Sequence, residues 1–205
     1  MRMRKVGWAV DYLPQAPCRI QDPETRAGTW NHPLHLEIGT GKGGYSLSMA
    51  ELYPEATFVA VEKNESAAGI AARKFDEKKL ENLHLIHGDG VEAASWFAPG
   101  EVDVLHLNFS DPWPKNRNAK RRLSADAFLD IYRQILAENG QIQMKTDNAK
   151  LFEYSVLQFL KGGFVLDEIS VDYRREPHPE DAVTEYEEKF IKEGKPIYRS
   201  VWIRK

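Results

Sequence analysis

Short apolar runs alternate along the chain with longer segments of helical periodicity. The runs predict seven strands, at Leu34–Ile38, Thr57–Val61, Leu83–Ile86, Val102–Phe109, Gln141–Lys145, Phe164–Val171 and Ile197–Ile203. The periodic segments predict six helices, at Gly44–Leu52, Glu65–Leu80, Gly90–Phe97, Ser124 to about Glu138, Ala149–Leu160 and Thr184–Lys192. Ser124 is expected to cap its helix, and Asn139-Gly140 to end it.

This alternation predicts an α/β fold with a doubly wound, seven-stranded, mostly parallel sheet that helices cover on both faces. The last two strands lack a full crossover helix between them, so we expect one of them to be antiparallel. The sheet domain is expected to span residues 31–205. Residues 1–30 are rich in Pro, Gly and polar side chains, and are expected to form an arm that leads into the domain and is free to move.

With 205 residues the chain is long enough for one domain with a substantial core. It has no apolar run that could span a membrane, and no apolar core of a signal peptide follows its first basic residues. The single cysteine, Cys18, excludes an intrachain disulfide and a cysteine-based metal site, and it fits a reducing compartment. The six histidines are scattered, so we expect no metal site, and we expect a cytoplasmic protein.

Basic side chains are placed unevenly along the chain. The net charge of −3 argues against a protein that coats nucleic acid over its whole surface. One stretch nevertheless carries five cations and no acid: Lys115, Arg117, Lys120, Arg121 and Arg122. A local patch of this kind determines where a phosphate backbone docks.

The segment N-F-S-D-P-W-P-K, from Asn108 to Lys115, leads into this basic block. Its two prolines stiffen the turn, and Asp111 falls just past the carboxyl end of a predicted strand, where open α/β sheets bind their ligands. Trp113 either stacks on a base or packs the turn, and packing is the favoured interpretation. A rigid acid beside an aromatic ring and a basic block indicates chemistry on a nucleic-acid base.

A glycine loop with the sequence G-T-G-K-G, carrying Gly39, Gly41 and Gly43, follows the first predicted strand. Glu37 precedes it, and Glu62 and Asp89 fall at or just past the ends of the next two strands, where they could bind a ribose and an adenine amine. The loop alone also fits a dinucleotide fingerprint. The charge of Glu37 disfavours a pyrophosphate there and favours a cationic cofactor, such as S-adenosylmethionine.

Together these segments resemble the bacterial tRNA (guanine-N7-)-methyltransferase family. K-T-D-N at 145–148 and T-E-Y-E-x-K-F at 184–190 make the resemblance specific, and it extends from about Leu34 to the C-terminus. It implies a class I (Rossmann-like) methyltransferase fold, S-adenosylmethionine as cofactor, and tRNA as partner, with 7-methylguanosine formed in the variable loop. The chain departs from the family in the basic loop, at Asn116 and Asn118, and between Val171 and Val183.

The resemblance also implies residue roles. The cofactor would be bound by Glu37, Gly39, Gly41, Glu62, Asp89 and Asp111, and Asp111 would also be the catalytic acid. The target guanine would be bound by Lys115, Asp147, Thr184, Glu185, Tyr186 and Glu187. The tRNA would be contacted by Arg117, Asn118, Ala119, Lys120, Arg121 and Arg122.

Guanine N7 carries a lone pair and no proton, so its methylation requires orientation rather than an obligatory base. Asp111 or Asp147 could accept from the Watson–Crick edge of guanine or stabilise the cationic product. Glu185 and Glu187 are either a grip on that edge or acids that favour a helix start. Tyr186 and Phe190 are expected to anchor their short helix in the core.

Three other function classes fit parts of the pattern. A nicotinamide-dependent oxidoreductase would explain the glycine loop but not the basic block. A non-catalytic RNA-binding protein would explain the basic block but not the acids at the strand ends. A class I methyltransferase that acts on another RNA site would explain both the basic block and the acids at the strand ends. The sequence is compatible with either a monomer or a homodimer.

Overall fold

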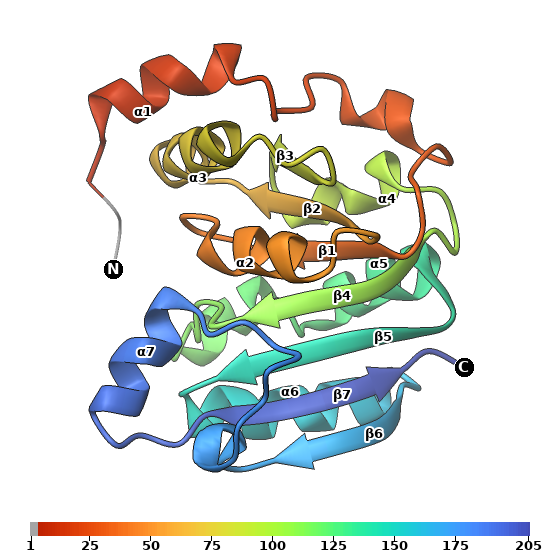
Figure 1. Ribbon diagram of the computed structural model, residues 1–205. Coiled ribbons are helices and arrows are strands. Elements are labelled where there is room, and N and C mark those ends of the chain that lie inside the picture. The colour runs from red at the N-terminus through yellow and green to blue at the C-terminus, as the bar shows by residue number, and fades with distance from the viewer. Residues whose placement is uncertain (1–3) are drawn as a thin grey trace.

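The computed structural model describes residues 4–205. A seven-stranded sheet with the order β3-β2-β1-β4-β5-β7-β6 crosses the molecule (Figure 1). Its strands are β1 (Leu34–Ile38), β2 (Thr57–Glu62), β3 (Leu83–His87), β4 (Val102–Asn108), β5 (Leu136–Thr146), β6 (Val165–Ser170) and β7 (Tyr198–Ile203). The strands β1 to β5 are parallel, whereas β7 is antiparallel to both β5 and β6. The predicted fold class is therefore confirmed.

Helices cover both faces of this sheet (Figure 1). They are α1 (Gly7–Tyr12), α2 (Gly44–Leu52), α3 (Glu65–Lys78), α4 (Ala93–Trp96), α5 (Asp126–Ile135), α6 (Ala149–Lys161) and α7 (Glu185–Lys192). Two separate apolar cores result. One joins the sheet to α2 and α3 and includes Tyr45, Met49 and Phe75, and the other joins it to α4, α5 and α6 and includes Trp96 and Tyr132.

The helix α5 is shorter than predicted. It ends at Ile135, and the chain passes directly into β5, whose first residue Leu136 pairs with Val102. Asn139, expected to end the helix, instead has a left-handed φ of 60° inside the strand. The expected cap is also wrong: Ala125 is the N-cap residue, and the hydroxyl of Ser124 lies 2.6 Å from that of Ser155.

The segment before β1 packs along the β3 side of the sheet. α1 lies so close to α3 that a methyl group on Gly69 would come within 2.0 Å of the carbonyl oxygen of Ala9. The backbone N–H of Cys18 donates to Asp76 on α3 at 2.8 Å, and Arg19 forms a parallel bridge with Leu85 of β3. In the described part of the chain, no helix is both long and apolar enough to cross a membrane.

Candidate functional site

The predicted site residues gather at the carboxyl edge of the parallel strands. In Figure 1 this is the edge at which the arrows of β1, β2, β4 and β5 end, and α7 lies beside it. Because the strand order is β3-β2-β1-β4-β5, the loops after these five strands are neighbours in space although they are far apart in the sequence.

The glycine loop between β1 and α2 folds back on β2. The backbone N–H groups of Gly39 and Thr40 both donate to the carbonyl of Val61, at 2.8 and 3.1 Å. Gly41 has a φ of 60° and Gly43 a φ of 75°, conformations that favour glycine. A methyl group on Gly43 would also lie 2.6 Å from the Phe75 ring, whereas one on Gly41 would meet no described atom within 4 Å. The loop is therefore packed on one side and open above Gly41.

Glu37 lies beneath this loop and stabilises it through hydrogen bonds. Its side chain is buried, and its carboxylate accepts from the hydroxyls of Thr40 (2.6 Å) and Ser46 (2.5 Å) and from the amide of Asn108 (2.9 Å). These bonds join the loop, the start of α2 and the end of β4. None of these three hydrogen-bond partners is a cation.

Glu62 closes the other side of the loop at the end of β2. Its carboxylate accepts from the N–H of Gly41 at 2.8 Å and from the N–H of Asn64 at 2.7 Å. Burial raises the pKa of Glu62, and the hydrogen bonds from the backbone of Asn64 and Gly41 oppose this shift. Each oxygen keeps a further lone pair. Asp89, after β3, caps the next turn through the N–H of Val91 and lies 3.5 Å from the ammonium of Lys63.

Asp111 is exposed on the loop after β4, whose backbone takes left-handed φ values at Phe109 (49°) and Trp113 (40°). The guanidinium of Arg122 holds this loop, since it donates to the carbonyls of Pro112 and Trp113, both at 3.0 Å. Arg121 lies over the ring of Trp113 at 4.9 Å, so this ring packs within the turn.

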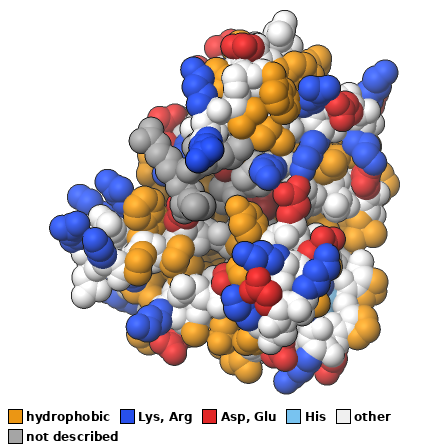
Figure 2. Space-filling model, turned by 90° about the vertical axis from the view of Figure 1, so that its left-hand side faces the viewer, with side chains coloured by type: hydrophobic (Ala, Val, Ile, Leu, Met, Phe, Trp, Pro, Cys, Tyr) orange, Lys and Arg blue, Asp and Glu red, His pale blue; other side chains and the backbone are white. Residues whose placement is uncertain are grey.

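The basic block itself forms a 3-10 helix at Asn116–Arg121. Of the residues predicted to contact RNA, Arg117, Lys120 and Arg121 are exposed, whereas Asn118, Ala119 and Arg122 are half-buried. Arg122 differs from the expectation, because its guanidinium supports the loop and covers the ring of Tyr154 at 4.2 Å. Figure 2 faces the carboxyl edge and shows Lys and Arg side chains around it, with acids interspersed.

The helix α7 begins against both loops. Thr184 caps it in a reciprocal capping box with Glu187. The side chain of Glu185 passes the start of α2, where a methyl group on Gly44 would lie 3.5 Å from its Cγ, and it pairs with Lys74 at 2.6 Å. The ring of Tyr186 stacks on Phe109, so α7 is tied to the loop that carries Asp111.

Two expectations for α7 differ from the structure. Tyr186 is not a core anchor, because it is 61% exposed, and Phe190 is half-buried against Phe109. Glu187 was expected either to grip the guanine or to be an acid that favours the helix start, and the second interpretation holds, because Glu187 lies in the first turn of α7 and completes its capping box. It is 0% exposed, and both its oxygens are hydrogen-bonded within the protein. A direct contact between Glu187 and a base is therefore absent from this arrangement.

Asp147 follows β5 and is half-buried. Asp147 lies near the loop that carries Asp111. Asn108 at the end of β4 pairs with Lys145 of β5, and the N–H of Phe109 donates to the carbonyl of Lys145 at 2.8 Å. The sequence did not single out Asn108, Thr40, Ser46 or Phe109 as functional. The only indication in the sequence was that each of these residues lies within or near a motif.

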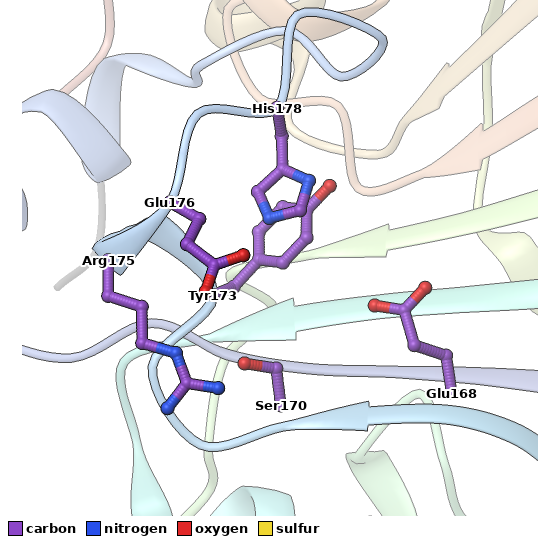
Figure 3. Close-up of a pocket in the computed structure, with 6 residues that line it drawn as sticks. All are labelled: Glu168, Ser170, Tyr173, Arg175, Glu176 and His178. Carbon is purple, nitrogen blue, oxygen red and sulfur yellow. The ribbon is translucent and has the colours of Figure 1, made fainter.

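A pocket of about 150 Å³ lies at the end of β6, away from these loops in the strand order. It is lined by Glu168, Ser170, Tyr173, Arg175, Glu176 and His178, and the rings of Tyr173 and His178 stack in it at 3.8 Å (Figure 3). None of the residues predicted to bind the cofactor or the substrate lines it.

Comparisons with known proteins place the chain in a family and show which solved structures share its fold. Residues 31–200 match a family model described as a putative methyltransferase. The tRNA (guanine-N(7)-)-methyltransferase of Oceanobacillus iheyensis is 43% identical over 97% of this chain and 97% of its own length. That of Geobacillus kaustophilus is 43% identical over 100% and 97%. A SAM-dependent methyltransferase from Aquifex aeolicus shares the fold, with a TM-score of 0.60, 13% identity and 90% of each chain covered.

Proposed function

Because the chain belongs to the tRNA (guanine-N7-)-methyltransferase family, we propose that it transfers a methyl group from S-adenosylmethionine to N7 of a guanine in the variable loop of tRNA, forming 7-methylguanosine. The observation that carries this proposal is the meeting of three segments at one sheet edge. The Asp111 loop contacts α7 through Phe109 and Tyr186, and α7 contacts the start of α2 through Glu185.

The residues at the glycine loop fit the cofactor. The space above Gly41 is open, and the carboxylate of Glu62 has lone pairs left for two ribose hydroxyls. Asp89 can accept from an adenine amine, and the buried charge of Glu37 favours a cation above the loop. When bound, S-adenosylmethionine supplies an electrophilic methyl group on a sulfonium. S-adenosylmethionine has no phosphate group. A dinucleotide would place its pyrophosphate next to the acidic side chain of Glu37, so a dinucleotide is disfavoured.

The chain's own residues then have to orient the guanine. Asp111 and Asp147 stand at the ends of neighbouring strands, and either carboxylate can accept from the N1–H and N2–H₂ groups of guanine. Lys115, exposed on the same loop, can donate to O6. Such contacts would orient the guanine, and the rate would come from that orientation and from electrostatic stabilisation of the cationic product.

The flanking RNA is assigned to the exposed basic block, with Arg117, Lys120 and Arg121 as phosphate ligands. Extraction of the guanine from its stack would bring it to the sheet edge, and the exposed ring of Tyr186 offers a surface on which it can stack. Such a tRNA substrate fits a cytoplasmic enzyme.

The test is methyl transfer from labelled S-adenosylmethionine to two unmodified tRNA transcripts. One carries the variable-loop guanine, and the other carries adenine in its place. We expect 7-methylguanosine, identified by mass spectrometry of the nucleosides, from the first transcript alone. Methylation of both would overturn the site, and no transfer despite cofactor binding would favour a non-catalytic RNA-binding protein.

Asp111→Ala separates catalysis from binding. We expect turnover to fall by about 100-fold or more, with tRNA affinity changed far less, because Asp111 acts on the guanine and not on the phosphate backbone. Equal losses of turnover and affinity would refute the catalytic role. Asp126→Asn, on the exposed first turn of α5, serves as the control.

A further inference from the structure

Four charged side chains form a buried cluster behind the N-terminus of α7. Lys145, Arg174, Asp181 and Glu187 are 2, 8, 6 and 0% exposed. The ammonium of Lys145 lies 2.7 Å from Asp181 and 3.1 Å from Glu187, and the guanidinium of Arg174 lies 2.5 Å from Asp181 and 2.9 Å from Glu187. Each cation thus contacts both carboxylates, and the two positive charges balance the two negative ones.

The members of this cluster come from three different parts of the chain. Lys145 belongs to β5 in the rigid sheet, Arg174 and Asp181 to the long connection after β6, and Glu187 to α7. Buried charges are tolerated when their partners and hydrogen bonds are complete, and removal of one partner leaves the others uncompensated. The cluster therefore favours one placement of the connection and of α7 against β5.

Tyr45 extends this cluster to the cofactor side. Its hydroxyl donates to Asp181 at 2.9 Å, and the ammonium of Lys145 lies 4.6 Å from the centre of its ring. Tyr45 is the second residue of α2, directly after the glycine loop. The cluster thus contacts the helix that begins at the cofactor loop as well as the helix that begins at Thr184.

A chain of hydrogen bonds fixes the direction of the Tyr45 hydroxyl. Since this hydroxyl gives its proton to Asp181, its oxygen accepts from Nδ1 of His106 at 3.2 Å. His106 Nε2, the remaining acceptor, then receives from Nδ1 of His35 at 3.0 Å. His106 is buried, and burial lowers its pKa well below the ordinary range, so the ring is neutral as this chain requires.

The connection between β6 and β7 has little regular structure apart from a 3-10 turn at Tyr173–Arg175 and the eight residues of α7. Tyr173 packs this turn, with Arg174 and Arg199 over its ring at 4.8 and 4.7 Å. A segment of this kind is held in place by its few buried contacts. The cluster supplies such contacts directly beside Thr184, Glu185 and Tyr186, the residues that the resemblance assigns to the guanine.

We propose that Lys145, Arg174 and Asp181 are positioning residues for methyl transfer, which hold the Thr184–Tyr186 segment in register with the glycine loop through Glu187 and Tyr45. This inference rests on the proposed function. The three residues are buried and paired, so they act on the guanine through the segment that they hold. A displacement of that segment by about 1 Å is enough to lower the rate by about 100-fold.

Asp181→Asn is the main test, because it keeps the shape of the side chain and removes one charge. We expect kcat/KM for tRNA to fall by about 10- to 100-fold, while the dissociation constant of S-adenosylhomocysteine changes less than about threefold. Tyr45→Phe, which removes the hydroxyl and keeps the ring, should lower kcat/KM in the same direction but less. Asp126→Asn, in an exposed ion pair with Lys161, is the matched control and should match the wild type.

A double-mutant cycle distinguishes positioning from a general loss of stability. If Asp181 acts through the segment, Asp181→Asn should cost much less activity in a Tyr186→Ala background than in the wild type. Additive losses in kcat/KM, or a loss explained by unfolding at the assay temperature, would overturn the proposal. Arg174→Lys, which keeps the charge, should retain more activity than Arg174→Gln.

Hydrogen exchange tests whether the cluster holds this segment in place, without a measurement of enzyme activity. In Asp181→Asn, amides of residues 171–187 should exchange at least about tenfold faster, while those of β1 and β2 remain unchanged. An unchanged rate in 171–187 would overturn the proposal even if the protein methylates tRNA as expected. If the wild type fails to form 7-methylguanosine, the proposed function fails by itself, and the exchange rates still decide whether the cluster holds the segment.

Discussion

Phe109 and Tyr186 stack with their ring centroids 6.4 Å apart and their planes inclined by 22°. This contact joins the loop that carries Asp111 to the helix that carries the T-E-Y-E motif, two segments far apart in the sequence. Phe109→Ala should lower kcat/KM for tRNA by about tenfold, because both segments must face one guanine. S-adenosylhomocysteine binding should stay within about twofold. Leu157→Ala, at an exposed position of α6, is the control, and an unchanged kcat/KM for Phe109→Ala would disprove this link.

Glu62 should dominate cofactor affinity. Its carboxylate at the end of β2 accepts from the N–H of Gly41, so Glu62→Ala removes the proposed ribose ligand and a hydrogen bond that holds the loop. We expect the dissociation constant of S-adenosylhomocysteine, measured by calorimetry, to rise by about 10- to 100-fold, or roughly 1.4–2.8 kcal/mol. Glu65→Ala, at the exposed start of α3, should leave it unchanged.

The same protein discriminates between cofactor classes in a melting experiment. S-adenosylhomocysteine should raise the melting temperature of the wild type, and this shift should disappear in Glu62→Ala. NAD should shift neither protein. A shift with NAD in the wild type would support the oxidoreductase that the glycine loop alone allows.

Two neighbouring cations of the basic block should behave differently. Arg122→Met removes hydrogen bonds to the carbonyls of Pro112 and Trp113, so we expect the free energy of unfolding to fall by about 1–3 kcal/mol. Lys120→Met removes an exposed charge, so stability should be unchanged while tRNA affinity falls and its salt slope decreases by about 1. Urea titration and filter binding measure the two effects. The assignment is refuted if Arg122→Met affects RNA binding alone.

Acid should destabilise the fold through its buried histidines. Burial lowers the pKa of His35 from 6.5 to about 4, so between these values the unfolded chain binds a proton that the folded chain does not. The free energy of unfolding therefore falls as the pH falls through this window, by roughly 2–3 kcal/mol for this one group. In urea titrations at several pH values, His35→Gln should make the free energy of unfolding depend less steeply on pH than in the wild type. His87→Gln, on β3, is the control variant. Parallel curves for His35→Gln and the wild type would contradict this origin.

Much of the sheet could be predicted because parallel strands buried on both faces appear as apolar runs. Leu34–Ile38 and Gly44–Leu52 were predicted residue for residue. The end of α5 could not be predicted from the sequence, because Ala137 and Glu138 have high helix propensity. In the structure, the pairing of Leu136 with Val102 overrides that preference. The arm was harder still, since its contacts with α3, such as Cys18 with Asp76, span 58 positions.

The acids at the strand ends could be predicted because topology alone brings those ends to one edge. The role of Glu187 could not, because its partners Lys145 and Arg174 lie 42 and 13 positions away in the sequence. Nor does a helix of eight residues reveal from its sequence which side faces the core. In the structure Glu187 points inward and its neighbour Tyr186 points outward, the reverse of what polarity suggests.

The position of β7 has a consequence for synthesis of the chain. β7 follows β6 in the sequence but lies between β5 and β6, and β6 is the edge strand bonded to β7. During translation β1 to β5 can pair as they emerge, whereas β6 must wait until Tyr198–Ile203 have left the ribosome. In that interval an unpaired strand with Val165, Leu166 and Ile169 is open to chaperones or to aggregation. Release of the chain before β7 is made would thus leave two strands, β5 and β6, without their shared partner, and such exposed strand edges are what quality control recognises.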